Sequence, residues 1–287
     1  MQGPILVVGA SGFIGSNLMN YLSFRKDVYG ISRRGPICVD ITNYGHLEHI
    51  IKEIKPRTIF NLTTYGGSSA QTDSTQIYNI NYMGANNLLR ILKEIGYDAF
   101  IQAGSQSEYG LNCAGPLEED RLIPNSDYAV AKIGVSYLIN YYGKALGFPC
   151  AHLRLYSIYG PGEGETRLMP KMVAYGMNKN YPPLADADVT HDFVYIDDCI
   201  EALVLAAEKI KCVKGEAINV ATGVATSLRD VALTAKKVFD IPHDPVFGTM
   251  PNRKWDLTNW YGEPAKAQAY LGWKYKTTLE EGMRRMM

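Results

Sequence analysis

The stretch Gly9-Ala10-Ser11-Gly12-Phe13-Ile14-Gly15 directly follows the short apolar run Ile5–Val8 and leads into a helical pattern. We expect the first glycine to allow a tight turn, the second to let the backbone approach a pyrophosphate, and the third to let the helix pack closely on the strand. The helix would then present free N–H groups and the positive end of its dipole to the anion. This order of strand, glycines and helix predicts a dinucleotide-binding turn.

Short apolar runs alternate with longer helical patterns through the first half of the chain. We expect strands at Ile5–Val8, Val28–Ser32, Thr58–Leu62, Phe100–Gly104 and Cys150–Leu155. We expect helices at Phe13–Arg25, His46–Ile54, Thr75–Ile95 and Tyr128–Leu146. Strands that alternate with helices form βαβ units, and strands that are apolar throughout fit a sheet covered on both faces. The sequence therefore predicts an α/β fold with a doubly wound parallel (Rossmann) sheet.

The regular alternation of strands and helices ends after about Pro161, where glycine, proline and polar residues interrupt the pattern. The later elements are shorter, with strands at Phe193–Ile196 and Ile218–Val220 and helices within Val194–Lys209, at Leu228–Phe239 and at Leu279–Arg285. We therefore expect residues 1–160 to form the dinucleotide-binding domain, which also recruits roughly residues 191–210. Residues 161–287 would form a smaller α/β lobe that binds the substrate. Because open α/β sheets bind ligands at the carboxyl ends of their strands, the site is expected between the two parts.

Composition excludes several classes of partner. The chain has 287 residues, of which 46% are hydrophobic, and a net charge of zero, so no general attraction to nucleic acid or anionic lipid is expected. No run approaches the roughly 20 apolar residues that cross a bilayer. The five cysteines form no CxxC pair and do not approach the histidines in metal-ligand spacing. We therefore expect a cytoplasmic protein with reduced thiols and no metal site.

The residues at the end of the second expected strand indicate which dinucleotide the protein prefers. An NAD-binding chain usually has an acidic residue there, which binds the ribose 2′-hydroxyl. This chain has Ser32-Arg33-Arg34 instead, and two guanidinium groups suit a 2′-phosphate. The alternative is that Arg33 and Arg34 lie on a solvated turn. The pattern favours NADP(H) over NAD(H), and Asp40, at the end of the next short strand, is a candidate ligand of the adenine amino group.

A tyrosine and a lysine one helical turn apart form a candidate acid–base pair. The ammonium favours the ionised phenol, while the phenol exchanges a proton with a substrate hydroxyl or carbonyl. Three pairs have this spacing, Tyr128/Lys132, Tyr175/Lys179 and Tyr270/Lys274. Only the first opens a helical pattern that follows a strand ending in a serine, Ser105, whose hydroxyl can bind the same substrate oxygen. We therefore expect Ser105, Tyr128 and Lys132 to be catalytic.

Together these residues resemble the extended short-chain dehydrogenase/reductase family, which includes nucleotide-sugar epimerases, dehydratases and reductases. The resemblance covers nearly the whole chain, through Asn81–Leu89, Ser105 with Tyr109-Gly110, Tyr128–Lys132, Leu153–Gly162, His191–Asp198, Ala269–Trp273 and Leu279–Gly282. It implies a nucleotide-diphosphate sugar as substrate, bound by the second lobe. It also implies a homodimer, in which helices 75–95 and 128–146 form a four-helix bundle with the same helices of the partner.

The resemblance implies further site residues. Cofactor contacts would come from Gly9, Ser11, Gly12, Phe13, Ile14, Gly15, Arg33, Arg34, Asp40, Ile41, Leu62, Asn81, Tyr128 and Lys132. Substrate contacts would come from Gln106, Ser107, Ser157, Arg167, His191 and Arg253. Arg167 and Arg253 stand where the family often binds the diphosphate, with surface solvation as the alternative. His191 replaces an arginine, and Ser157 replaces an asparagine that the family often has.

The residues after Ser105 bear on the reaction. Sugar 4,6-dehydratases of this family carry an acid–base pair there, but Gln106 and Ser107 cannot act as a base. Glu108 comes one position late, which in an extended segment points it away, although a loop could re-aim it. We therefore expect NADPH-dependent reduction of the C4 keto group of a nucleotide-diphosphate 4-keto-6-deoxy sugar, with Tyr128 as proton donor. The alternatives are a 4-epimerase, then a 4,6-dehydratase and, last, a non-catalytic NADP-binding regulator.

Overall fold

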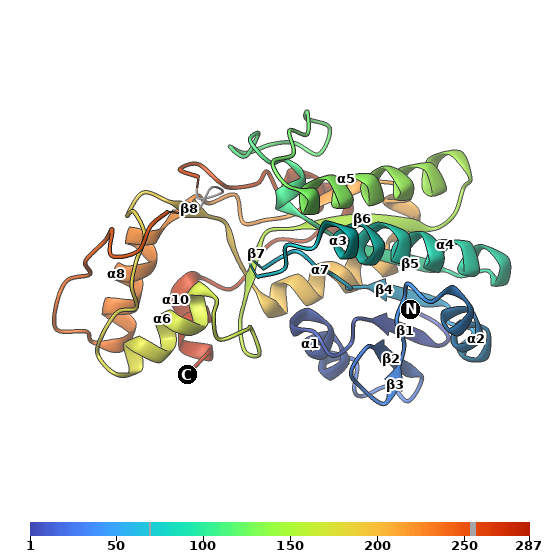
Figure 1. The fold of residues 1–287 in the computed structure, drawn as a ribbon, viewed down its shortest axis with the longest axis horizontal. Coiled ribbons are helices and arrows are strands. Elements are labelled where there is room, and N and C mark those ends of the chain that lie inside the picture. The colour runs from blue at the N-terminus through green and yellow to red at the C-terminus, as the bar shows by residue number, and fades with distance from the viewer. Residues whose placement is uncertain (69, 253–256) are drawn as a thin grey trace.

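A computed structural model describes residues 1–68, 70–252 and 257–287 of the protein (Figure 1). Within these residues the main sheet has seven strands in the order β10-β6-β5-β4-β1-β2-β3. Their bounds are β1 Ile5–Val8, β2 Val28–Ser32, β3 Ile37–Cys38, β4 Thr58–Asn61, β5 Ala99–Ser105, β6 Cys150–Leu155 and β10 Ala217–Val220. All pairings in this sheet are parallel. The predicted parallel α/β sheet is therefore confirmed.

Helices cover both faces of the sheet. On one face lie α2 (Tyr44–Ile54), α4 (Gly84–Ile95) and α5 (Asp127–Asn140), which pack on alternate strand residues such as Leu6 and Val8. The opposite face is covered by α1 (Phe13–Tyr21) and α7 (Ile196–Glu208), which pack on Ile5 and Val7. Because both faces are buried, β1 is apolar at every position. No helix in the described ranges is both long and apolar enough to cross a membrane.

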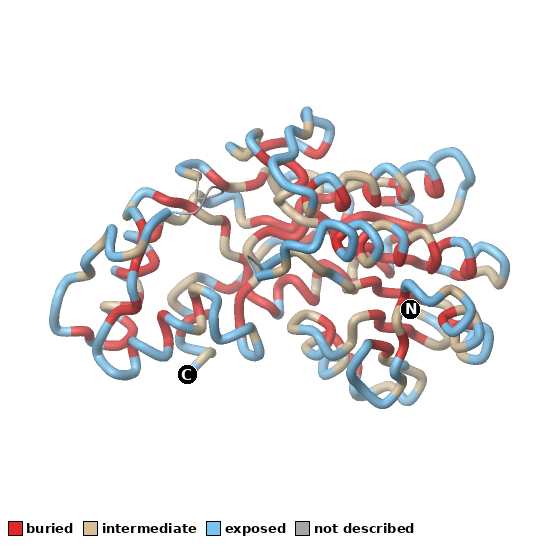
Figure 2. The backbone as a smooth tube through the Cα atoms, viewed as in Figure 1, coloured by how far each residue is buried: buried red, intermediate tan, exposed pale blue. Residues whose placement is uncertain are grey.

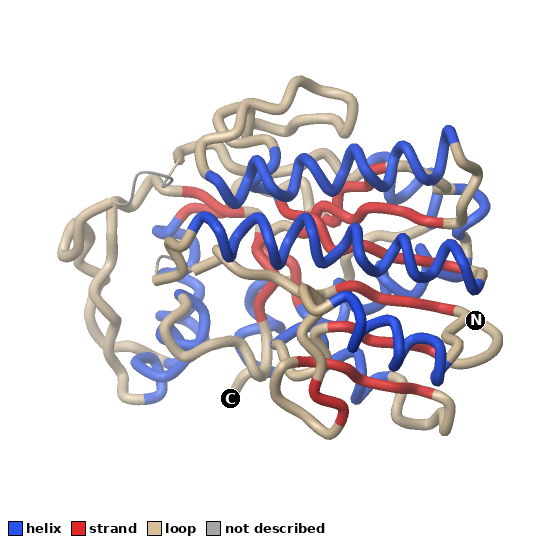
Figure 3. Tube along the Cα trace, turned by 45° about the vertical axis from the view of Figure 1, so that its right-hand side comes forward, coloured by secondary structure: helices blue, strands red, loops and turns tan. Residues whose placement is uncertain are grey.

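The two long predicted helices are each composite. The first begins as α3 (Ser74–Tyr78), continues through the π-helical turn η1 (Asn79–Met83) and ends as α4. The second is α5 followed by the π-helical turn η3 (Tyr141–Ala145). In Figures 1 and 3, α4 and α5 run side by side along one face of the sheet.

The second part of the chain holds two two-stranded sheets and more helices than the sequence pattern indicated. Its strand pairs are β8 (Thr190–His191) with β11 (Thr226–Ser227), and β7 (Ser157–Tyr159) with β9 (Phe193–Tyr195). Its helices are α6 (Leu168–Met177), α8 (Leu228–Phe239), α9 (Ala265–Leu271) and α10 (Leu279–Arg285). The sequence analysis missed α6 because Pro170 interrupts its pattern. The proline lies in the first helical turn, where its lacking N–H has no intrahelical partner to lose.

The expected division at residue 160 describes the sheet incompletely. Strand β10 lies at one edge of the main sheet, where Ala217–Val220 pair with residues 152–155 of β6. The sheet therefore also recruits residues 217–220, which the expected division assigned to the lobe. Residues 217–220 reach the sheet because α7 leads the chain from β9 back along the sheet to its edge.

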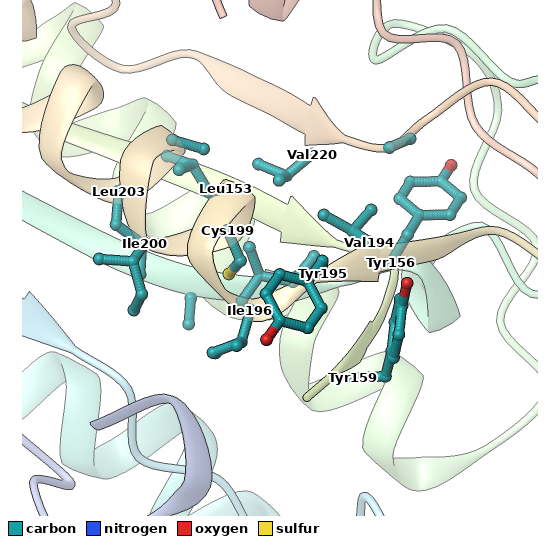
Figure 4. Close-up of a cluster of buried hydrophobic side chains, with 14 of the residues drawn as sticks. Leu153, Tyr156, Tyr159, Val194, Tyr195, Ile196, Cys199, Ile200, Leu203 and Val220 are labelled. Carbon is teal, nitrogen blue, oxygen red and sulfur yellow. The ribbon is translucent and has the colours of Figure 1, made fainter. Parts of the chain in front are cut away.

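The sheet and the second part of the chain share one hydrophobic core. Figure 4 shows part of this cluster, formed by Leu153, Tyr156, Tyr159, Val194, Tyr195, Ile196, Cys199, Ile200, Leu203 and Val220. The same cluster continues into α6 and α8 through Met172 and Val231. In Figure 2 buried stretches of backbone occur both in the sheet and in the second part of the chain. The two parts are thus packed against each other through apolar side chains.

Candidate active site

The predicted glycine turn lies at the carboxyl end of β1. Gly9 has a φ of +86°, and a Cβ there would lie 3.0 Å from the backbone carbonyl carbon of Leu62. A Cβ at Gly15 would lie 2.2 Å from the carbonyl oxygen of Gly9. Gly12 is the N-cap of α1, and no side chain caps this end of the helix. The turn therefore leaves helix N–H groups free for an anion, as the sequence predicted.

A pocket of about 360 Å³ opens beside this turn. Eight of the predicted cofactor-binding residues line it, Gly9, Ser11, Gly12, Arg33, Arg34, Asp40, Ile41 and Leu62. Six are not among its lining residues, Phe13, Ile14, Gly15, Asn81, Tyr128 and Lys132. The glycine cradle and the open helix end fit a bound dinucleotide, and the two guanidinium groups stand at the edge of the same pocket.

Residues 32–34 line the pocket, and the turn that they begin leads into β3. The hydroxyl of Ser32 donates a hydrogen bond to the carbonyl of Arg34 at 2.5 Å. The thiol of Cys38 donates to the carbonyl of Arg33 at 3.3 Å. Both arginine side chains are exposed. The backbone of this turn is thus fixed while the guanidinium groups can reach a ligand.

Eight further residues line the pocket and were not predicted as cofactor contacts. They are Val8, Ile31, Ser32, Val39, Thr63, Thr64, Gln71 and Ile80. Thr63 and Thr64 follow the strand that pairs with β1, so the carboxyl ends of the two strands meet at the same edge. The rule that ligands bind at this edge would have identified both threonines.

Asn81 holds this segment in place. Its side-chain amide donates to the carbonyls of Tyr65 at 2.6 Å and Ile77 at 2.8 Å, and its side-chain oxygen accepts from the N–H of Tyr65 at 3.3 Å. The side chain is 2% exposed, and its hydrogen bonds are directed to protein backbone. Asn81 therefore positions the wall of the pocket in this structure, where the resemblance implied a direct cofactor contact.

The three predicted catalytic residues lie at the same end of the sheet. Tyr128 is in the first turn of α5, whose N-cap Ser126 accepts from the N–H of Ala129. Lys132 is 1% exposed, and its ammonium nitrogen lies 5.7 Å from the centre of the Tyr128 ring. That ammonium donates to the carbonyl of Ala103 at 3.0 Å, two residues before Ser105 on β5. The lysine thus ties the start of α5 to the end of the strand that carries the serine.

Ser105 begins a turn that the sequence analysis took as extended. Residues Gln106–Glu108 form a short 3-10 helix, η2, which packs against α5. The Ser105 hydroxyl oxygen accepts from the N–H of Ser107 at 3.1 Å, and the Glu108 carboxylate accepts from the N–H of Ser105 at 2.8 Å. The Ser105 hydroxyl still has its own proton to donate.

The structure separates the other two tyrosine–lysine pairs from this arrangement. Tyr175 lies exposed on α6, and the ammonium of Lys179 donates to the carbonyl of Phe239 at 2.6 Å. Tyr270 lies exposed on α9. Only the pair on α5 is linked to the strand end.

A buried polar network holds the 3-10 helix η2 in place. Glu108 is fully buried, and its carboxylate binds the ring Nε2 of His152 at 2.8 Å and Nε of Arg154 at 2.8 Å. Arg154 also donates to the Tyr109 hydroxyl at 2.8 Å and to the carbonyl of Glu118 at 2.9 Å. Glu108 therefore points into the protein. The expected extended segment is instead a 3-10 helix, and this turn directs the carboxylate toward β6.

The charges in this network support one another. Burial alone would raise the pKa of Glu108, but its interactions with His152 and Arg154 outweigh burial and lower that pKa to about 2. A Cβ on Gly104 would lie 2.2 Å from Nε2 of His152 and 2.6 Å from Oε1 of Glu108. Glycine at this position therefore leaves the room in which the ion pair forms.

Two predicted substrate residues bind each other across the strand ends. The side-chain amide of Gln106 donates to the hydroxyl of Ser157 at 3.2 Å. His191 lies in β8 with its ring 5.7 Å from the ring of Phe193 and 5.5 Å from that of Trp260. Arg253 lies outside the described residues.

Arg167 connects the second part of the chain to the segment after β4. It is the N-cap of α6, and its guanidinium donates to the carbonyl of Gly67 at 3.3 Å. Its Nε lies 3.6 Å from the carboxylate of Glu163, whose other oxygen is buried without a hydrogen-bond partner. Burial raises the pKa of Glu163 to about 7, although Arg167 opposes this shift.

Comparisons with known proteins agree with this geometry. The family model described as "NAD dependent epimerase/dehydratase family" matches residues 5–221. The chain is 28% identical to a UDP-glucose 4-epimerase from Mycolicibacterium smegmatis, over 97% of this chain and 95% of that protein. It is 24% identical to a GDP-6-deoxy-D-mannose reductase from Pseudomonas aeruginosa, over 100% of this chain and 97% of that protein.

The similarity extends to solved structures and to part of a larger protein. The crystal structure of a UDP-glucose 4-epimerase from Thermotoga maritima with UDP-glucose superposes with a TM-score of 0.89 at 25% identity, covering 99% of this chain and 97% of that one. The chain also spans 46% of the length of a trifunctional dehydratase/epimerase/reductase of Arabidopsis thaliana, at 25% identity over 99% of this chain. From the family match and the shared fold, the chain belongs to the NAD-dependent epimerase/dehydratase family.

Proposed function

We propose that the protein is an NADPH-dependent reductase that acts on the C4 keto group of a nucleotide-diphosphate 4-keto-6-deoxy sugar. The observation that carries this proposal is the position of Arg33 and Arg34, which line the pocket where NAD-binding chains have a carboxylate. Two guanidinium groups favour a 2′-phosphate. NADPH is the dinucleotide that cells use mainly as a reductant, and the similarity to a sugar-nucleotide reductase supports the same reaction class.

The mechanism assigns a role to each residue at the strand end. The dinucleotide, when bound, supplies the hydride that C4 accepts. Tyr128 donates its proton to the C4 oxygen, and the hydroxyl of Ser105 donates a hydrogen bond to that oxygen as negative charge develops. The ammonium of Lys132 lies 5.7 Å from the centre of the Tyr128 ring, so its positive charge faces the negative charge that develops as the proton leaves. The helix end at Gly12 holds the pyrophosphate.

The proposal disfavours elimination of water. A 4,6-dehydratase needs a base beside the serine, whereas Gln106 and Ser107 carry no titratable group. The nearest carboxylate, Glu108, is fully buried and bound by His152 and Arg154. A substrate could reach it only if this ion pair were broken.

A 4-epimerase is the second candidate, because two of the similar proteins are UDP-glucose 4-epimerases. The same three side chains would serve, but the hydride would return to the opposite face of the C4 carbon and the proton to the C4 oxygen. Such an enzyme consumes no NADPH.

The test is to mix the protein with NADPH and 4-keto-6-deoxyhexoses linked to UDP, GDP, dTDP or CDP, and to follow the nicotinamide absorbance. Oxidation of NADPH with one of these sugars is expected. Tyr128→Phe should lower the turnover by about 100-fold or more. Tyr175→Phe, from an exposed pair of the same spacing, is the control and should keep wild-type turnover. Sugar interconversion without NADPH oxidation would favour the epimerase.

The cofactor preference has its own test. Replacing both Arg33 and Arg34 with alanine should raise KM for NADPH by about 10-fold or more and leave KM for NADH nearly unchanged. Equal effects on both cofactors would remove the support for NADP(H).

We also propose that the protein forms a homodimer through α4 and α5. Val130, Tyr137 and Tyr141 are exposed and lie seven and four positions apart, so they share one helix face. A second copy that packs the same helices against this face would bury the three side chains. Light scattering of the wild type and of Tyr137→Glu tests this, with a dimer and a monomer expected respectively.

A further inference from the structure

The hydroxyl of Tyr128 has a partner in the segment after β4. Oγ1 of Thr64 donates to the Tyr128 hydroxyl oxygen at 3.4 Å. Thr64 is exposed and lines the dinucleotide pocket. Among the described residues, Thr64 is the side chain that forms a hydrogen bond with the Tyr128 hydroxyl. Thr64 therefore touches both the candidate proton donor and the solvent side of the site.

The segment that carries Thr64 is held close to Tyr128. Asn81 binds both backbone polar groups of Tyr65, the next residue. A Cβ on Gly66 would lie 3.2 Å from the ring of Tyr128, so the backbone of this segment lies against the tyrosine ring. The contact between the two hydroxyls is thus fixed by backbone on both sides.

The proposed reaction consumes one proton in each turnover, and this hydrogen bond offers a route by which Tyr128 can regain it. Each reduction moves one proton from Tyr128 to the sugar oxygen, and the phenolate must regain a proton before the next turnover. Lys132 is buried and its ammonium binds the carbonyl of Ala103, so it has no direct contact with bulk water. Thr64 is exposed, and its hydroxyl oxygen lies 3.4 Å from the phenol oxygen that needs a proton.

We propose that Thr64 relays a proton from solvent to Tyr128 between turnovers. The O–H bond of Thr64 breaks as its proton moves to the phenolate oxygen, and Thr64 takes a proton from a water molecule in the same event, so that hydroxide is left in the solvent. The relay rests on the proposed reduction, because an epimerase returns the proton to the sugar and has no net demand for one. Thr64 is then a catalytic residue for the recovery of the enzyme and takes no part in the first hydride transfer.

The distinguishing variant is Thr64→Val, which keeps the shape of the side chain and removes the hydroxyl. Thr75→Val is the matched control, because Thr75 is exposed on α3 and is not among the residues that line the pocket. In stopped-flow experiments with excess NADPH and the sugar nucleotide that turns over fastest, Thr64→Val should oxidise the first equivalent per site at nearly the wild-type rate. Its later turnovers should be about 10-fold slower or more. Thr64→Ser should restore the steady-state rate to within about 3-fold.

Two further measurements separate a relay from a packing role. Binding of NADPH, titrated by fluorescence without sugar, should stay within about 2-fold of the wild type in Thr64→Val. The steady-state rate of this variant should fall more steeply than that of the wild type as the pH rises, because the proton must come directly from solvent. A first turnover slowed as much as the later ones, or a control variant equally impaired, would overturn the relay.

The relay and the reduction can fail separately. A wild-type enzyme that reduces the sugar, together with a Thr64→Val variant of equal steady-state rate, overturns the relay alone. A wild-type enzyme that oxidises no NADPH with any of the sugar nucleotides overturns the reduction, and the relay with it.

Discussion

Replacing Glu108 with glutamine should destabilise the protein strongly although the shape of the side chain is kept. The carboxylate accepts from Arg154 on one oxygen, and from Ser105 and His152 on the other. A glutamine has one acceptor oxygen, so its NH2 group must face either the N–H of Arg154 or that of Ser105. Removing one partner of a buried ion pair costs about 3 to 5 kcal/mol, because the remaining charge stays buried without its counter-charge.

The pH dependence gives a second measure of the same interaction. The pKa of Glu108 falls from its ordinary value of 4.5 to about 2, which at about 1.4 kcal/mol per pH unit corresponds to about 3 kcal/mol. Because the pKa is lowered in the folded state, this stabilisation is complete above pH 4.5 and is lost as the pH falls toward 2. The difference in stability between the wild type and Glu108→Gln should therefore narrow to about 2 kcal/mol at pH 3.5.

Thermal unfolding followed by circular dichroism is the assay. At pH 7 the Tm of Glu108→Gln should lie about 5 to 8 °C below that of the wild type. Glu280→Gln is the control, because Glu280 pairs with Lys237 and Arg284 at the surface, and its Tm should equal that of the wild type within error. A Tm of Glu108→Gln within about 2 °C of the wild type, or a deficit that does not narrow in acid, would refute the reasoning.

Three other substitutions test the pocket and its surroundings. Gly15→Ala places a methyl group 2.2 Å from the carbonyl oxygen of Gly9, so the turn must open, and calorimetry should show the Kd for NADPH raised about 10-fold or more. Asn81→Ala removes the hydrogen bonds that hold Tyr65, and we expect a loss of about 2 kcal/mol in urea unfolding together with weaker NADPH binding. Glu163 has a raised pKa of about 7, so its stabilisation is complete below pH 4.5 and is lost as the pH rises through 7. Glu163→Gln should therefore be more stable than the wild type by about 2 to 3 kcal/mol at pH 8, and an equal gain at pH 4 would contradict this origin.

The sequence predicted the parallel sheet well because burial on both faces leaves a simple signal. Residues 5–8, 28–32 and 150–155 are mostly apolar segments of strand length, and the structure has strands with these same bounds. The short lobe elements were harder, because strands of two or three residues such as β8 and β11 depend on partners far away in the chain.

The site was predicted in part for a similar reason. The glycine turn and the Tyr128/Lys132 spacing are local patterns, so they could be found from the sequence. Glu108 was read as part of an extended segment because its ion-pair partners lie on another strand. His152 and Arg154, two residues apart in the otherwise apolar β6, were the available signal, since alternate residues of a strand share one face.

The apolar core that joins the sheet to α6 and α8 restricts how a ligand can enter. A rotation of the two parts as rigid bodies would expose buried side chains to water, at about 25 cal/mol for each Å² uncovered. Small local movements avoid this cost. The hydrogen bond between Arg167 and the carbonyl of Gly67 joins the start of α6 to the segment after β4. The Arg167 side chain is exposed, so it can move without disturbing the core. Substrate exchange in this protein is therefore expected to depend on side chains and short loops at the rim, at rates faster than domain opening would allow.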